Sequence, residues 1–161
     1  MTHLAFIAMP TSDADHLRNG GVDAYGNRPE TAISDGPGHP CRHCLANIDA
    51  GKAYLILAYR PFPTLQPYAE TGPIFLHAEE CPRYEAVEEL PPMLASSDYI
   101  VRGYGDNDRI VYGSGAVTPT VEMGKRAEAL FERDDIAYLH VRSARNNCYQ
   151  CRIERPAAAT G

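Results

Sequence analysis

Residues 136–153, IAYLHVRSARNNCYQCRI, decide the fold class of this chain. Two runs within this stretch, 136–142 and 149–153, alternate apolar and polar side chains, which is typical of half-buried β-strands. The residues between them, 143–147, are small or polar and suit a turn. The stretch therefore predicts an antiparallel hairpin close to the carboxyl end of the chain.

Further strands are predicted upstream of this hairpin. Runs rich in apolar and β-branched residues occur at 4–9, 53–59, 73–78, 99–104 and 109–112. The run at 53–59 is continuously apolar, so we expect a central strand that is buried on both faces. Turn residues at 105–108 join two of the runs and predict a second hairpin. The segment 22–40 is rich in Gly and Pro and predicts an irregular loop or a meandering edge segment.

Two segments carry helix signals. Thr11 or Ser12 is a candidate N-cap for a short helix that reaches about Leu17. A longer helix is predicted over 120–133, where Val121 is one of the apolar residues at helical spacing.

Many strands with few helices define the expected fold class. Consecutive strands linked by short turns favour antiparallel pairing, whereas a doubly wound α/β fold would need helices that alternate with the strands. We therefore expect a single α+β domain over residues 1–156, with a mainly antiparallel sheet and two or three short helices. The last residues, 157–161, are expected to form a disordered tail.

Composition and charge exclude several classes of protein. The chain has 161 residues and a formal net charge of −6, which disfavours a protein that follows nucleic-acid phosphates. No apolar run approaches the roughly 18 residues that span a bilayer, and the amino end lacks the basic start of a signal peptide. We expect a cytoplasmic protein that binds neither nucleic acid nor a membrane. Nothing in the sequence indicates an oligomeric state.

The five cysteines are the most distinctive feature of the composition. Four of them form two Cys-x-x-Cys pairs, Cys41 with Cys44 and Cys148 with Cys151. Two such pairs can supply the four thiolates of a tetrahedral zinc site. In a reducing compartment, cysteine pairs indicate metal or redox chemistry before structural disulfides. The sequence therefore suggests zinc as a cofactor, with these four residues as candidate ligands.

Strand geometry argues against the second pair. Along a straight strand, Cys148 and Cys151 face opposite sides, so a zinc site would require Cys148 to lie in a bend. Asn146 and Asn147 could provide that bend. Without it, Cys151 is an ordinary buried thiol. A metal site, inert thiols, and disulfide or redox use are the three alternatives.

The fifth cysteine has a histidine nearby. Cys81 follows His77, with Glu79 and Glu80 between them. This group can form a small zinc corner, or a catalytic thiol beside its base. The alternative is a histidine that ends a strand and a cysteine that begins the next loop.

One face of the terminal hairpin carries polar side chains. Antiparallel pairing would place His140 near Gln150, on the same face as Arg142 and Cys148. Such a face can bind a small anionic ligand, such as a carboxylate, through Arg142 joined by Arg42. The alternative is a solvated outer face of the sheet.

Short motifs along the chain resemble a known family. They are PCRHCL at 40–45, YAETGPIFLH at 68–77 followed by Cys81, RGY at 102–104, HVR at 140–142, CY at 148–149 and RIER at 152–155. Together they resemble a bacterial family called domain of unknown function 1203, from about Phe6 to Arg155. The resemblance implies one compact bacterial domain of about this length, with no established reaction. Members that keep the first cysteine of each pair without the second imply that Cys41, Arg42 and Cys148 are the better candidates for a shared site.

Two classes of function follow from these residues. In a binding module, the cysteines of the two pairs are closed metal ligands, and the metal supports the fold. In an enzyme, a cysteine beside His77 or His140 acts as nucleophile or as ligand of an open metal site, and Arg42 or Arg142 orients an acidic substrate. Redox use of a Cys-x-x-Cys pair is a further alternative.

Overall fold

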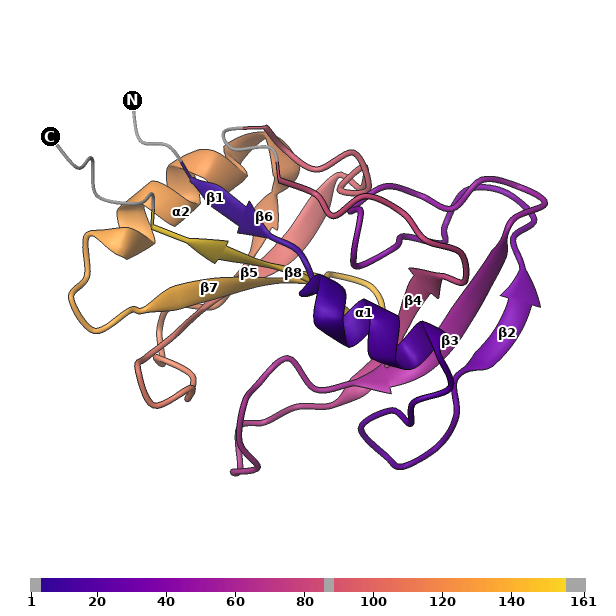
Figure 1. The fold of residues 1–161 in the computed structure, drawn as a ribbon. Helices are drawn as coiled ribbons and strands as arrows, with labels where there is room; N and C mark the ends of the chain where they lie inside the picture. The colour runs from indigo at the N-terminus through magenta and orange to yellow at the C-terminus, as the bar shows by residue number, and fades with distance from the viewer. Residues whose placement is uncertain (1–3, 86–88, 156–161) are drawn as a thin grey trace, which may run out of the picture.

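Two antiparallel sheets form the framework of the protein (Figure 1). The structure is a computed structural model that describes residues 4–85 and 89–155. The larger sheet has the strand order β1-β8-β7-β5-β6, and the smaller sheet has the order β2-β3-β4. Two α-helices accompany the sheets, so the expected α+β fold is confirmed. The tail expected at 157–161 lies outside the described residues.

The order of the elements along the chain explains the two sheets. The elements are β1 (Ala5–Ile7), α1 (Thr11–Arg18), β2 (Glu30–Ile33), β3 (Ala53–Tyr59), β4 (Gly72–His77), β5 (Asp98–Tyr104), β6 (Ala116–Pro119), η1 (Thr120–Glu122), α2 (Met123–Phe131), β7 (Tyr138–Ser143) and β8 (Tyr149–Glu154). The three strands of the smaller sheet are consecutive. The larger sheet combines the carboxyl-terminal half of the chain with β1, which pairs with β8 at one edge.

The terminal hairpin forms as predicted, but it contains a bulge. The register of β7 and β8 shifts between Val141 and Arg142, where β8 contributes one extra residue, Gln150. Arg142 lies opposite Tyr149 at the turn, one residue further along than expected, and beyond the bulge His140 lies opposite Arg152. The expected pairing of His140 with Gln150 is therefore wrong.

The second predicted hairpin forms only in part, because the run after its turn does not become a full strand. The turn at 105–108 forms, but the run after it joins β5 through an isolated bridge between Tyr104 and Ile110. Ser114 Oγ then accepts the amide hydrogen of Gly103 at 3.0 Å, so this backbone group is already satisfied by a side chain. Backbone hydrogen bonds join Gly105 to Arg109 and Val111 to Gly103 across the turn, whereas β6 pairs with the first part of β5, at 98–101.

Both predicted helices are present, with different starting points. Pro10 is the N-cap of α1, and the expected side-chain cap is wrong because Thr11 Oγ1 contacts the ring of His43 at 2.8 Å instead. The second helix begins with the 3-10 turn η1, and Val121 in this turn is 95% exposed rather than buried. No helix in the described part of the chain is long and apolar enough to cross a membrane.

Each sheet shares an apolar core with one helix. In the larger sheet, α2 packs against the face formed by Val101, Leu139, Val141, Cys151 and Ile153. In the smaller sheet, α1 adds Ala14 and Leu17 to a core with residues of β3 and β4. The two sheets lie side by side in Figure 1, with α1 in front of the smaller one.

The smaller sheet bears out two expectations and prepares the site. β3 is its central strand, although Ile56 and Ala58 are only half-buried, so the burial of its second face is partial. The edge alternative for 22–40 is confirmed, because β2 lies at the edge of this sheet. The connection from β2 to β3 carries the first Cys-x-x-Cys pair.

Candidate metal centre

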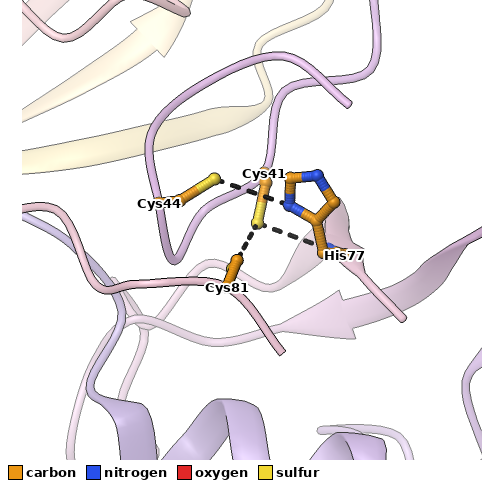
Figure 2. A group of neighbouring side chains, drawn as sticks. All are labelled: Cys41, Cys44, His77 and Cys81. Carbon is orange, nitrogen blue, oxygen red and sulfur yellow. Dashed lines mark hydrogen bonds between the residues drawn. The ribbon is translucent and has the colours of Figure 1, made fainter. Parts of the chain in front are cut away.

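A tight turn between β2 and β3 holds the first Cys-x-x-Cys pair. Pro40 and Asn47 form a bridge at its base, and the Cys41 carbonyl oxygen accepts the Leu45 amide hydrogen at 2.9 Å. Leu45 has a φ of 56°, a left-handed conformation that helps to reverse the chain. The turn directs the sulfur atoms of Cys41 and Cys44 toward the end of β4 (Figure 2).

The strand β4 and the loop after it supply the other two side chains. Cys41 forms a parallel bridge with Phe75, which fixes the turn beside β4. His77 is the last residue of β4, and Cys81 lies in the loop that follows. The candidate pair of His77 and Cys81 is thereby brought against the first Cys-x-x-Cys pair (Figure 2).

The four side chains lie close together, and two of the distances between them match the edges of a tetrahedral metal site. One ligand atom from each of Cys41, Cys44, His77 and Cys81 lies within 4.8 Å of the others. The Cys41 and Cys81 sulfurs are 3.8 Å apart, and the Cys44 sulfur is 3.5 Å from His77 Nδ1. Zinc at its usual bond lengths gives tetrahedral edges of about 3.8 Å between two sulfurs and about 3.6 Å between sulfur and nitrogen. This Cys3His cluster can therefore hold a metal ion.

Hydrogen-bond donors surround the sulfur atoms of the cluster. The His77 amide donates to Cys41 Sγ at 3.3 Å, and Arg18 Nη2 donates to Cys81 Sγ at 3.1 Å. Arg18 Nε also donates to the His77 carbonyl oxygen at 2.9 Å. One guanidinium thus supports both ends of the segment that supplies His77 and Cys81, and its charge favours thiolates.

His43 connects the cluster to α1. Its Nδ1 lies 3.2 Å from Cys81 Sγ, and its Nε2 lies 2.8 Å from Thr11 Oγ1. Burial and the nearby charge of Arg18 lower the pKa of His43, which favours the neutral ring. In the tautomer that suits both contacts, Nδ1–H donates to the sulfur and Nε2 accepts from the Thr11 hydroxyl.

The three thiols of the cluster shift one another's pKa values. The pKa of Cys41 is lowered because the thiols of Cys44 and Cys81 donate hydrogen bonds to its sulfur. The pKa values of Cys44 and Cys81 are raised chiefly because their thiols are the hydrogen-bond partners of the Cys41 sulfur and would lose that bond on ionising. Cys41 is also the fully buried member, whereas the other three residues are half-buried. A cation among these sulfurs would relieve the repulsion between thiolates.

The second Cys-x-x-Cys pair lies elsewhere. Cys151 is fully buried in the core beneath α2, opposite Val141, and burial raises the pKa of its thiol to about 12. Cys148 precedes β8 and is half-buried, with its sulfur 3.7 Å from the Asn146 carbonyl oxygen. The two residues follow the course of a strand and do not form a turn of their own. The structure therefore groups Cys41 and Cys44 with His77 and Cys81 rather than with this pair.

The predicted residues Arg142 and His140 belong to β7 of the larger sheet, and Arg42 contacts β8. Arg42, Arg142 and His140 are 3%, 6% and 0% exposed, so the alternative of a solvated outer face is wrong. Arg42 Nε donates to the Tyr149 carbonyl oxygen at 2.8 Å, which brings the Cys41 and Cys148 regions together. Aromatic rings surround His140 at centroid distances of 4.7 to 5.2 Å: Phe62, Tyr104, Tyr138 and Tyr149.

Two residues that contact the cluster, His43 and Arg18, were not predicted from the sequence. His43 stands inside the first Cys-x-x-Cys pair, but its contact depends on the placement of Cys81. Arg18 ends α1 and reaches the cluster across 63 positions of sequence. The presence of histidine between the two cysteines was the one local signal, and it does not distinguish a ligand from a neighbouring donor.

The fold and the cluster define a small α+β domain with a Cys3His group that can hold a metal. Residues 38–155 match the family described as Protein of unknown function (DUF1203), and the chain belongs to that family. The matched range begins later than the expected Phe6, but it includes all four residues of the cluster. No curated protein and no solved structure matches the chain.

Proposed function

We propose that this protein is a zinc-binding domain in which Cys41, Cys44, His77 and Cys81 hold a structural zinc ion. The observation that carries the proposal is the agreement between two distances and the edges of a zinc-centred tetrahedron. The sulfur–sulfur edge is 3.8 Å and the sulfur–nitrogen edge is 3.5 Å. Both lie within about 0.1 Å of the edges that ordinary Zn–S and Zn–N bonds give.

The donor set favours zinc among the common divalent ions. Three thiolates and one imidazole are soft to borderline ligands, which suit zinc and disfavour magnesium and calcium. All four ligands come from the protein, so the tetrahedron is closed and leaves no position for a substrate. A closed site of this kind supports the fold rather than catalysing a reaction.

Charge in the surroundings agrees with this assignment. A zinc ion with three thiolates carries a single negative charge. Arg18 donates to Cys81 Sγ at 3.1 Å and supplies the compensating positive charge. His43 and the His77 amide add neutral donors to two of the sulfurs. Donors of this second layer orient ligands and raise metal affinity in known sites.

The placement of the cluster indicates what the metal would stabilise. It joins the turn at 40–47 to the end of β4 and the loop that begins after it. Through Arg42, the same turn also contacts β8 of the larger sheet. Zinc would therefore fix the junction of the two sheets, and its binding free energy would contribute directly to folding.

Metal analysis with single variants tests this proposal. Protein purified from zinc-supplemented medium without chelators is expected to contain about one zinc per chain by elemental analysis. Cobalt substitution should give the d–d bands of a tetrahedral site together with thiolate-to-cobalt charge transfer. Cys81→Ser and His77→Ala should weaken both signals, whereas the matched controls Cys148→Ser and Cys151→Ser should retain them. Zinc that survives in Cys81→Ser and disappears in Cys148→Ser would overturn the ligand set.

A further inference from the structure

A cavity of about 340 Å³ opens where the turn with the first Cys-x-x-Cys pair meets the larger sheet. Its walls come from that turn, from the segment before β5 and from the loop between β7 and β8. Arg42 lines the cavity from the turn, and Gln150, the extra residue of the β8 bulge, lines it from the larger sheet. The cavity therefore lies at the junction of the two sheets.

The charge of this cavity is positive and unpaired. Among the described residues that line it, Arg42 is the only one with an acidic or basic side chain. The guanidinium donates to the carbonyl oxygens of Pro40 and Tyr149, which are neutral groups. No carboxylate within 4–85 and 89–155 forms an ion pair with it. Buried charges are normally paired, and Arg42 is only 3% exposed, so the cavity lacks a counter-charge.

One guanidinium nitrogen of Arg42 remains available to a ligand. Nε and Nη1 donate to the two carbonyl oxygens, whereas Nη2 has no hydrogen-bond partner in the described part of the chain. The fully buried atoms without a partner in that part belong to Arg126, His140, Arg142 and Arg152, so Nη2 of Arg42 keeps accessible surface. Because Arg42 lines the cavity, this nitrogen can donate to a molecule inside it. Its two bonds to backbone oxygens hold the guanidinium in place before the ligand arrives.

The rest of the lining suits an organic acid. Ser96 and Asn146 use only backbone atoms in their hydrogen bonds to other described residues, so both side chains are available to a ligand. Phe75 and Met93 add apolar surface. One arginine matches the single charge of a carboxylate, whereas a phosphate carries nearly two charges at neutral pH and would leave one of them uncompensated.

We propose that this cavity binds a small organic monocarboxylate, whose carboxylate accepts a hydrogen bond from Arg42 Nη2 and whose apolar body contacts Phe75 and Met93. The ligand supplies the counter-charge that Arg42 lacks among the described residues. This site is separate from the proposed zinc centre, since none of the four residues of the Cys3His cluster lines the cavity. The proposal therefore does not depend on the metal.

A titration of the full chain followed by two-dimensional proton–nitrogen NMR tests the site. The probes are butyrate and butyramide, which have almost the same size and shape but differ in charge. At constant ionic strength, butyrate should cause saturable shifts of the backbone amides of residues 95–99 and 143–150, and butyramide should not. No saturable shift with butyrate, or equal shifts with butyramide, would overturn the proposal. Saturation by inorganic phosphate but not by butyrate would overturn the organic acid as the ligand.

A carboxylate introduced into the cavity by mutation gives the matched variant. Ser96→Asp adds this group to the lining, where it should pair with Arg42 and lower the affinity for butyrate by about tenfold or more. Ser97→Asp is the control, because it adds the same charge one residue further along, outside the lining, and should stay within about twofold of the unmodified chain. Both serines are exposed and Arg42 is unchanged, so both variants are expected to fold. Equal affinities of the two variants for butyrate would overturn the proposed site.

Discussion

The guanidinium of Arg42 donates from Nε to the carbonyl oxygen of Tyr149 at 2.8 Å, across 107 positions of sequence. Its Nη1 donates to the Pro40 carbonyl oxygen at 2.7 Å, so a buried cation binds backbone groups of both cysteine regions. Burial lowers the pKa of Arg42 to about 10, which still leaves it charged near neutral pH. Arg42 therefore connects the regions of the two Cys-x-x-Cys pairs.

Arg42→Met is expected to destabilise the protein by about 2 to 4 kcal/mol, because it leaves the Tyr149 carbonyl oxygen buried without its donor. Urea unfolding followed by circular dichroism measures the free energy of unfolding. Arg133→Gln is the control, since this exposed arginine pairs with Asp135 at the surface, and its loss should change the free energy of unfolding little. An Arg42→Met protein as stable as the control would show that the contact does not hold the sheets together.

Removal of zinc should lower the stability of the domain substantially. A ligand present at about 1,000 times its dissociation constant stabilises the folded state by about 4 kcal/mol, which corresponds to roughly 8 to 16 °C in Tm for a chain of this size. Thermal unfolding before and after dialysis against a chelator, followed by zinc addition, measures the effect and its reversal. The same treatment of Cys44→Ser should leave Tm unchanged, and an equal loss in that variant would argue against a metal effect.

His43→Ala should weaken zinc binding without changing its stoichiometry. The ring donates to Cys81 and accepts from Thr11, so its removal takes away a donor that orients one ligand. Second-layer changes of this kind typically cost about 10- to 100-fold in metal affinity. Competition with a coloured chelator measures the affinity, and Thr11→Val should cause a smaller loss in the same direction. Complete loss of zinc would instead identify His43 as a direct ligand.

His140 should make the protein less stable as the pH falls. Burial, together with Arg142, Arg152 and Arg102, lowers the pKa of His140, so the folded state keeps the ring neutral while the unfolded state binds a proton. The protein is therefore at full stability above the unfolded-state pKa near 6.5. Below that pH, its free energy of unfolding falls by at most about 1.4 kcal/mol per pH unit. The neighbouring rings of Tyr104, Tyr138 and Tyr149 remain neutral in this range.

The quantity to measure is the slope of the free energy of unfolding against pH, between about pH 7 and about pH 5. His140→Asn should flatten this slope relative to the unmodified protein. His43, whose pKa is also lowered, contributes to the slope in both proteins and so cancels in the comparison. His16→Asn, on the exposed side of α1, is the control. An unchanged slope in His140→Asn would mean that His140 is not the titrating group.

Local sequence patterns predicted much of the fold, because they record which face of each element is buried. The strands at 53–59 and 149–153 and the helix after Thr11 follow from period and composition alone. The bulge at Gln150 could not be anticipated, since nothing in an alternating run marks the extra residue. Val121 illustrates the same limit, because a 3-10 turn before α2 rotates it out of the apolar face.

The candidate site was predicted in two halves that local patterns could not join. Cys41 with Cys44 and His77 with Cys81 were each recognisable as ligand pairs, and the Cys41–Phe75 bridge brings them together. That bridge is a long-range contact with no signature in spacing. The second Cys-x-x-Cys pair has the same spacing as the first, but Cys148 precedes β8 and Cys151 lies within it, so spacing alone did not indicate the grouping that the structure shows.

Zinc-edge X-ray absorption of the metal-loaded protein measures the proposed centre most directly. We predict three sulfur ligands at about 2.3 Å and one nitrogen at about 2.0 to 2.1 Å, with no bound water. The Cys81→Ser protein should show one sulfur fewer, and the Cys148→Ser protein should be unchanged. A first shell of four sulfurs, or one dominated by oxygen, would contradict the Cys3His centre.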